Sequence, residues 1–148
     1  MLAFSIEEMD VKDFMQHLFV LETFSSFEIR GVTIHGFTYF EISGEKPRQE
    51  DEKVSYCTWE ELRPYVRHII KGKDKPRAMK LIFAQTEPEK LHSNAAALFI
   101  NMIYEGDKIV CTTATGQKSF DLTRAVDTEW ESWVQSFFRK NGINVTLG

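Results

Sequence analysis

Six basic side chains lie within one short stretch of the sequence, residues 63–77, at the end of a predicted helix and in the loop after it. They are Arg63, Arg67, Lys71, Lys73, Lys75 and Arg77. The first three recur every four residues, which places them along one flank of a helix. Guanidinium and ammonium groups on such a flank can replace the counterions of a phosphate backbone. The spacing therefore predicts an anion-binding surface for nucleic acid or an anionic protein.

The charge of the whole chain has the opposite sign. Its 148 residues hold 18 Lys and Arg against 22 Asp and Glu, a formal net charge of -4. Residues 63–80 alone hold seven bases and one acid, a net charge of +6. Such an island indicates a local anionic partner. A structural explanation stays open, because the helix dipole favours cations near a helix C-terminus by about 0.3–1 kcal/mol each.

The nucleophiles and the metal-binding residue types show no catalytic arrangement. Cys57 precedes a predicted helix N-terminus, where a thiolate is stabilised, but no base lies near it in the sequence. A lone cysteine commonly packs as a small apolar residue. The four histidines have no metal-ligand spacing, and the eight glycines form no phosphate-binding loop. We therefore expect no catalytic residue, no metal site and no cofactor.

Two other functions stay open beside a non-enzymatic binding or scaffolding domain. The protein could be an enzyme for a small anionic substrate, in which an acid such as Glu28 or Glu41 transfers a proton. It could also be a structural homodimer joined through the aromatic stripe of Trp130, Trp133 and Phe137 near the C-terminus. The regular helical period of that stripe equally fits a helix that covers a sheet as core.

The composition predicts one cytoplasmic domain that does not enter a membrane. A length of 148 residues, 43% hydrophobic, suits a single domain with its own core. The two cysteines are far apart, which fits a reducing compartment. No run of about 18 apolar residues occurs, and the first ten residues contain acids but no basic segment.

The first part of the sequence predicts a strand, a helix and two more strands. Leu2, Phe4 and Ile6 alternate as in a strand, and Asp10 can cap the following helix. Residues 27–42 are rich in β-branched and aromatic side chains, and their glycines suit a bulge or a tight turn. Residues 44–53 contain no large apolar side chain, so we expect an exposed connection.

The same element order is predicted again after this connection. Residues 54–57 form a short strand, and Thr58 with Glu61 forms a capping box for the next helix. The apolar face of that helix holds Trp59, Leu62, Tyr65, Val66, Ile69 and Ile70. Three strands follow, at residues 78–85, 96–104 and 108–114, with a hairpin turn at EGDK and a second turn at residues 115–118.

A C-terminal amphipathic helix over residues 125–141 completes the domain, with Thr128 and Glu131 as a candidate capping box. We therefore predict an α+β fold with a mainly antiparallel sheet. It consists of two β-α-β-β units, at about residues 1–43 and 54–122, and this final helix.

Two resemblances add to this prediction. The segments MLAFSI, VKDFMQHLFVLETFSSFEI and WEELRPYVRHIIKGKDKP resemble an uncharacterised bacterial family of unknown function, over nearly the whole chain. The doubled element order, with EKVSYCTWEELRPYVRHIIKG before AMKLIFAQ, is similar to one domain of the sliding DNA clamps. The second resemblance implies a clamp-like fold only. The acids Glu7, Glu8, Asp10 and Asp13 would repel a duplex, so the sequence does not support a DNA-lined channel.

Overall fold

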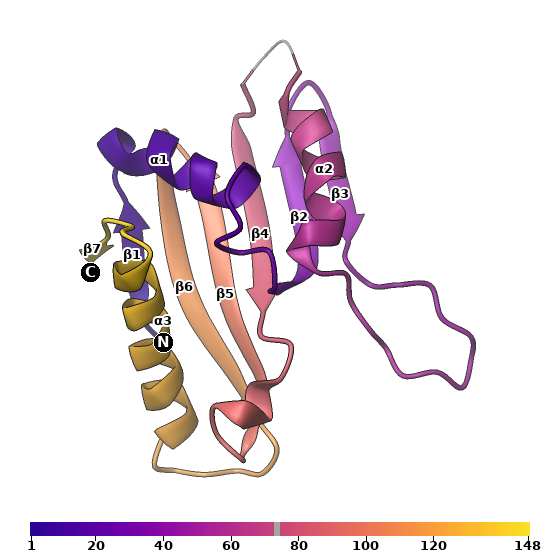
Figure 1. Ribbon diagram of the computed structural model, residues 1–148, viewed down its shortest axis with the longest axis vertical. Coiled ribbons are helices and arrows are strands. Elements are labelled where there is room, and N and C mark those ends of the chain that lie inside the picture. The colour runs from indigo at the N-terminus through magenta and orange to yellow at the C-terminus, as the bar shows by residue number, and fades with distance from the viewer. Residues whose placement is uncertain (73–74) are drawn as a thin grey trace.

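The computed structural model describes residues 1–72 and 75–148, and this part of the chain contains three α-helices and seven strands (Figure 1). In chain order the elements are β1 (Ala3–Ile6), α1 (Glu8–Phe19), β2 (Glu28–His35), β3 (Tyr39–Ser43), α2 (Trp59–Ile70), β4 (Ala78–Ala84), the 3₁₀ helix η1 (Pro88–Lys90), β5 (Ala95–Glu105), β6 (Lys108–Gln117), α3 (Ala125–Lys140) and β7 (Thr146–Leu147).

All seven strands belong to one antiparallel sheet, in the order β3-β2-β4-β5-β6-β1-β7. β5 and β6 are joined by a tight turn in which Gly106 and Asp107 have φ of 61° and 62°. Two successive positive φ values are typical of a type I′ hairpin turn. The predicted α+β class, the mainly antiparallel sheet and the C-terminal helix are confirmed.

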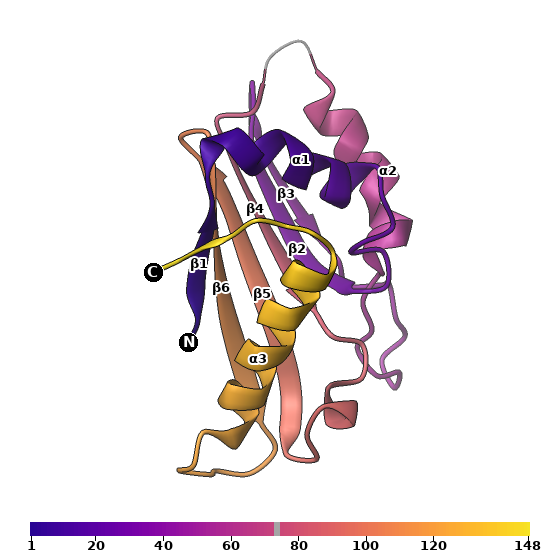
Figure 2. The same cartoon turned by 60° about the vertical axis from the view of Figure 1, so that its left-hand side comes forward.

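The three helices cover one face of the sheet and leave the other face in solvent (Figures 1 and 2). Alternation along β4 shows this division: Met79, Leu81 and Phe83 are buried, whereas Lys80 is exposed. The covered face carries the core, and its largest fully buried side chains include Trp59, Trp130, Phe14, Phe24, Phe83 and Phe138.

Two buried tryptophans also make hydrogen bonds to the backbone. The indole N–H of Trp59 at the start of α2 donates to the carbonyl of Leu18 near the end of α1, at 2.6 Å. The indole N–H of Trp130 on α3 donates to the carbonyl of Phe99 on β5, at 2.9 Å. Each tryptophan therefore fills the core with its ring and fixes one element against another.

Helix starts agree with the predictions only in part. Thr58 and Glu61 form the capping box of α2, as predicted. α1 starts at Glu8, so the prediction that Asp10 caps it is wrong and Asp10 lies in its first turn.

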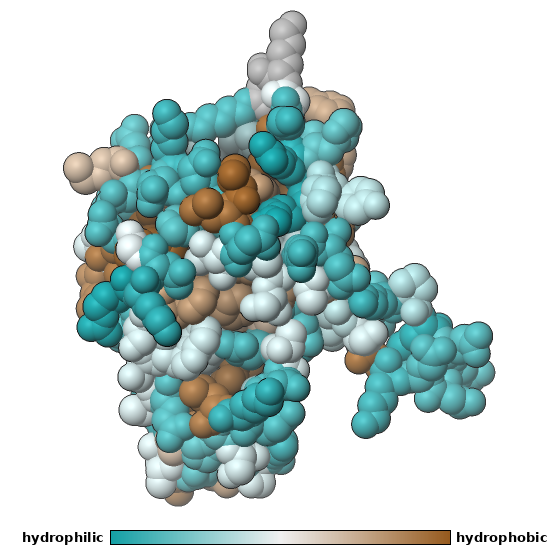
Figure 3. Space-filling view, in the orientation of Figure 1, coloured by the Kyte–Doolittle hydropathy of each residue, from teal (hydrophilic) through white to brown (hydrophobic). Residues whose placement is uncertain are grey.

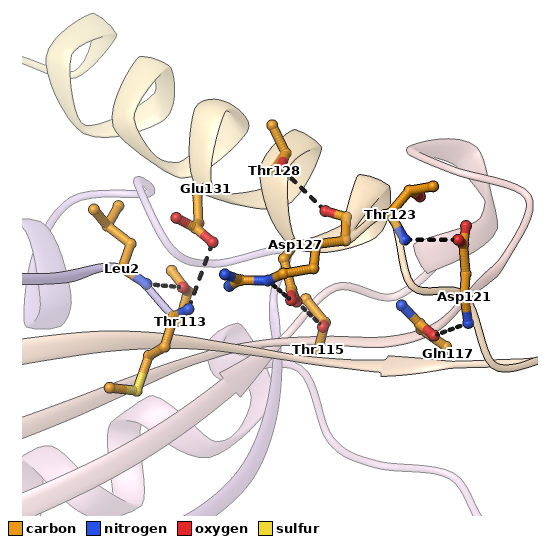
Figure 4. A network of polar contacts seen from close by, with 11 residues as sticks. Leu2, Thr113, Thr115, Gln117, Asp121, Thr123, Asp127, Thr128 and Glu131 are labelled. Carbon is orange, nitrogen blue, oxygen red and sulfur yellow. Dashed lines mark hydrogen bonds and ion pairs between the residues drawn. The ribbon is translucent and has the colours of Figure 1, made fainter.

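The predicted capping box of α3 is wrong as well, because α3 begins at Ala125 and Thr128 lies inside the helix. Arg124 precedes the helix in a left-handed conformation, with φ of 59°. The hydroxyl of Thr128 donates to the carbonyl of Arg124 at 3.0 Å. Asp127 in the first turn accepts hydrogen bonds from Thr115 and from Arg124, and the bond from Thr115 lowers the pKa of Asp127 (Figure 4).

Two predicted features of the second half are wrong. Residues 54–57 form no strand. Within them Tyr56 makes one isolated bridge, with Glu45, and a second isolated bridge joins the following residue, Thr58, to Glu28. The reason is that β2 already pairs with β3 and β4. The segment before α2 therefore contacts only the start of β2, through the bridge to Glu28 and through the N–H of Ile29, which donates to the carbonyl of Cys57 at 2.9 Å. The predicted turn at residues 115–118 is also absent, since β6 continues to Gln117 and stays paired with β5, with a register shift between Ala95 and Ala97.

The segment between β3 and α2 extends away from the body as an arm with a mainly hydrophilic surface (Figures 1 and 3). Gly44 lies buried at its base, where its N–H donates to the carbonyl of Arg30 at 3.0 Å and its carbonyl accepts from Cys57 at 2.8 Å. A Cβ on Gly44 would lie 1.6 Å from the carbonyl oxygen of Ile29. Only glycine fits this close approach of two backbones.

No helix within the described residues is long and apolar enough to cross a membrane.

The arm base gives a test of the fold. Gly44→Ala should lower the free energy of unfolding by at least about 2 kcal/mol, because two backbone segments must separate to admit the methyl group. Gly31→Ala on β2 is the matched control: its Cβ would meet nothing closer than Ile42 O at 3.7 Å, so a change within about 1 kcal/mol is expected. Urea unfolding followed by tryptophan fluorescence measures both, and equal effects would contradict this account.

Candidate functional site

The apolar face of α2 decides which side of the helix packs against the core, and its capping box decides where the helix begins. Trp59 and Val66 are fully buried, and Leu62, Ile69 and Ile70 pack partly buried against the core. The prediction that Tyr65 joins this face is wrong, because Tyr65 lies at the margin of the stripe and is 69% exposed. The opposite flank of α2, with its basic residues, is left toward solvent.

Arg63 is the most enclosed of these basic residues, and it contacts the loop after α1. Its guanidinium donates to the carbonyl of Leu21 at 2.7 Å, to the hydroxyl of Ser25 at 3.2 Å and to the carboxylate of Glu22 at 3.3 Å. Its side chain is only 14% exposed. Hydrogen bonds from Ser25 and then Arg63 lower the pKa of Glu22. Arg63 thus holds this loop against α2, and its charge is already compensated.

Arg67 and His68 lie further along α2, and Lys71 directly follows its last residue. Together with Arg63 they line a shallow hollow of about 340 Å³. Phe19 and Val20, at the end of α1, form its apolar side, and Val20 is 46% exposed. Figure 3 shows apolar surface bordered by hydrophilic residues where α1 ends beside α2. In the ranges that the structure describes, Arg67, His68 and Lys71 make no ion pair with an acid. We call these three residues the α2 cationic strip.

The other predicted cations are placed elsewhere. Lys75 pairs with Asp107 of the β5–β6 turn, with Nζ 2.8 Å from Oδ1, and lines a different cavity from the strip. That hydrogen bond raises the pKa of Lys75 and lowers the pKa of Asp107. Arg77 is exposed just before β4, where its N–H donates to the carbonyl of His35 at 2.8 Å. Lys73 lies outside the described residues.

Comparison with known proteins identifies the family. The family model DUF5721, described as a family of unknown function, matches residues 17–146. The chain belongs to this family. A search of curated proteins found no match, and a search of solved structures found none either. The likeness to an uncharacterised family predicted from the sequence is therefore confirmed.

The aromatic stripe of this DUF5721 chain packs within the domain. Trp130 is fully buried, and Trp133 and Phe137 are partly buried against the core. The rings of Trp130 and Trp133 stack at 5.2 Å between centroids, and those of Trp133 and Phe137 at 5.0 Å. Phe27 meets both Trp133 and Phe137 edge-on. The stripe thus packs on the sheet as part of the core.

No Asp or Glu of the described residues is buried. Glu28, on β2, pairs with Arg30 at 3.2 Å, and Glu41 is exposed on β3. Neither carboxyl has the enclosed position that proton transfer by a tuned acid requires. A search of the same residues finds no group of three His, Cys, Asp or Glu that could hold a metal ion.

The sequence prediction missed two parts of the DUF5721 surface. His68 belongs to the cationic strip, and its place directly after Arg67 on the exposed flank was a signal that could have indicated it. Val20 joins the same hollow from α1, 43 residues before Arg63 in the chain, and no pattern in the sequence brings these two segments together. Their contact comes from the packing of α1 against α2.

Arg63 should affect stability more than its neighbour on the strip. Arg63→Ala removes hydrogen bonds to Leu21, Glu22 and Ser25, so it should lower the free energy of unfolding by about 1–3 kcal/mol at pH 7. Arg67→Ala is the matched control and should change it by less than about 0.5 kcal/mol. Urea titrations measure both.

The same pair of variants tests the carboxylate. The pKa of Glu22 is lowered from its ordinary value of 4.5 in the folded protein, so its stabilising contribution is present above that value and is lost as the pH falls through the folded pKa. The difference between wild type and Arg63→Ala should therefore shrink in acid. A difference that stays constant with pH would contradict a role of Glu22.

The two cysteines should differ sharply in reactivity. Cys111 on β6 is fully buried, and burial raises the pKa of its thiol to about 12. Cys57 is only partly buried. A disulfide reagent such as DTNB should modify one thiol in each native chain. The Cys57→Ser variant should show no modification in the native state, and the wild type unfolded in guanidinium should show two modified thiols. Modification of both thiols at equal rates in the native protein would contradict this difference in reactivity.

Because the folded pKa of Cys111 is raised, the contribution of this thiol to the free energy of unfolding should be lost as the pH rises above about 8.5.

Proposed function

We propose that this DUF5721 protein is a non-enzymatic binding domain that holds an anionic partner on the α2 cationic strip, with the phosphates of nucleic acid as the first candidate. The observation that carries the proposal is the gathering of Arg67, His68 and Lys71 around one hollow with no acid paired to them in the described residues. An unpaired cation on a rigid helix is free to exchange its counterion for a phosphate.

The number of free cations limits the strength of such an interaction. Arg67 and Lys71 are charged at neutral pH, and His68 adds a charge only when it is protonated. Each phosphate contact contributes about -0.7 to -0.9 to the slope of the logarithm of the binding constant against the logarithm of the salt concentration. Two to three contacts therefore give a slope of about -2, with weak binding that is lost at moderate salt. The acids Glu8 and Asp13 are exposed on α1, and their negative charge disfavours a long anionic partner that would extend along that helix.

Location, assembly and a clamp-like arrangement belong to the same proposal. We infer a cytoplasmic protein from the wide separation of Cys57 and Cys111. The initial order β1, α1, β2 and β3 supports a likeness to one half of a clamp domain.

A homodimer through Trp133 and Phe137 stays a prediction. If it forms, the mass in solution should fall from that of a dimer to that of a monomer in Trp133→Glu.

Charge reversal on the strip tests the function. Fluorescence anisotropy with labelled 20-nucleotide single strands and 20-bp duplexes should give a dissociation constant about tenfold higher for Arg67→Glu/Lys71→Glu than for wild type in low salt. The matched control is Arg139→Glu/Lys140→Glu at the exposed end of α3, which changes net charge equally and should leave binding nearly unchanged.

The outcomes separate the hypotheses. Equal loss in both double variants would show that only net charge matters, and the strip would have no special role. Absence of binding to every nucleic acid, together with salt-sensitive binding of polyglutamate, would overturn the nucleic-acid assignment in favour of an acidic protein partner. Absence of both would overturn the proposed function.

A further inference from the structure

A second hollow, of about 470 Å³, lies between α1, the segment after α2 and the ends of β4 and β5. α1 crosses the sheet at this end of the molecule (Figures 1 and 2). The walls of the hollow are mainly apolar and come from Val11, Met15, Ile70, Pro76, Met79 and Tyr104. This volume falls within the range of small-molecule sites. None of the residues of the α2 cationic strip lines it.

The floor of this cavity belongs to the ordered core of the sheet. Met79 and Tyr104 are 3% and 5% exposed and are directly paired neighbours on β4 and β5. Val11 and Met15, one turn apart on α1, form the opposite wall and are only partly buried. Apolar side chains therefore face the hollow from both the sheet and the helix, and a ligand with an apolar body would remove the exposed parts of Val11 and Met15 from water.

The mouth carries two acids and two bases, Glu8, Asp107, Lys12 and Lys75. Lys75 and Asp107 are paired at 2.8 Å, and the hydroxyl of Tyr104 lies 3.4 Å from the same carboxylate oxygen of Asp107. Glu8 lies in the first turn of α1, where the helix dipole offsets part of its negative charge. Lys12 is exposed, and the described residues contain no ion pair to it. Lys12 and Glu8 thus lie one turn apart at the edge of the apolar cavity, and Lys12 is the group of this pair that can meet an anionic ligand.

We propose that this cavity binds a small apolar carboxylate. The apolar body of the ligand lies between α1 and the β4–β5 floor, in contact with Met15 and Met79, and its carboxylate meets the ammonium group of Lys12. The proposal is independent of the function assigned to the α2 cationic strip, since the two sites share no residue.

The methionine methyl groups allow a direct test with sodium octanoate as the probe. In protein labelled with ¹³C at the methionine methyls, millimolar octanoate should shift the signals of Met15 and Met79. Met9 is 87% exposed, and Met102 is buried but does not line the cavity, so both serve as internal controls. Absence of a shift at Met15 and Met79, or equal shifts at all four methionines, would overturn the proposal.

Head-group charge is tested with 1-octanol and octylamine, which share the chain of octanoate. Octanoate should bind about two- to fivefold more tightly than octanol, as expected for one exposed ion pair, and octylamine more weakly than either. Lys12→Gln should abolish the preference for octanoate over octanol without changing octanol binding.

Lys71→Gln on the cationic strip is the matched control and should change neither affinity. If octylamine binds most tightly, or if the octanoate preference survives in Lys12→Gln, the assignment of a carboxylate to Lys12 is wrong. Normal nucleic-acid binding by Lys12→Gln would separate this site from the function proposed above.

Discussion

The fold depends on the burial of one face of a single antiparallel sheet under aromatic side chains. Phe24, in the loop after α1, lies at the centre of this layer. Its ring lies 5.8 Å from Phe14 on α1, 5.5 Å from Phe83 on β4 and 5.9 Å from Phe138 on α3, between centroids. Such pairs each add about 0.5–1.5 kcal/mol to the effect of burial. Because one ring joins two helices, a loop and the sheet, the positions of these elements depend on one another.

This aromatic layer decides which residues remain for function. It turns Trp59 and Val66 of α2 inward, so Arg67 and Lys71 are left toward solvent. The hydrogen bonds of Arg63 then close the edge between α2 and the loop after α1, and they compensate its charge. Residues of one type on one helix flank therefore have different roles: Arg63 stabilises the fold, while Arg67 and Lys71 stay available.

The two candidate sites differ in the physical effect on which binding would depend. The α2 cationic strip is a shallow surface, where attraction to an anion acts through water and is screened by salt. The cavity beside α1 is lined by Met15, Met79 and other apolar side chains, so burial of the ligand supplies most of the binding energy and Lys12 only selects its head group. Lys75 belongs by sequence to the first site but by structure to the second, where its pair with Asp107 helps to shape the mouth.

The sequence by itself determined the local features of this protein. The capping box of Thr58 and Glu61, the EGDK hairpin turn and the helix over residues 125–140 depend on neighbours a few residues away, and the α+β class follows from them. The tertiary structure alone decided that Arg63 meets Glu22 and that Lys75 meets Asp107. It also decided that residues 54–57 form no strand and that Met15 faces Met79 across a cavity. These pairings join residues far apart in the chain. They arise from the way the helices pack on the sheet, and no spacing in a single sequence records that packing.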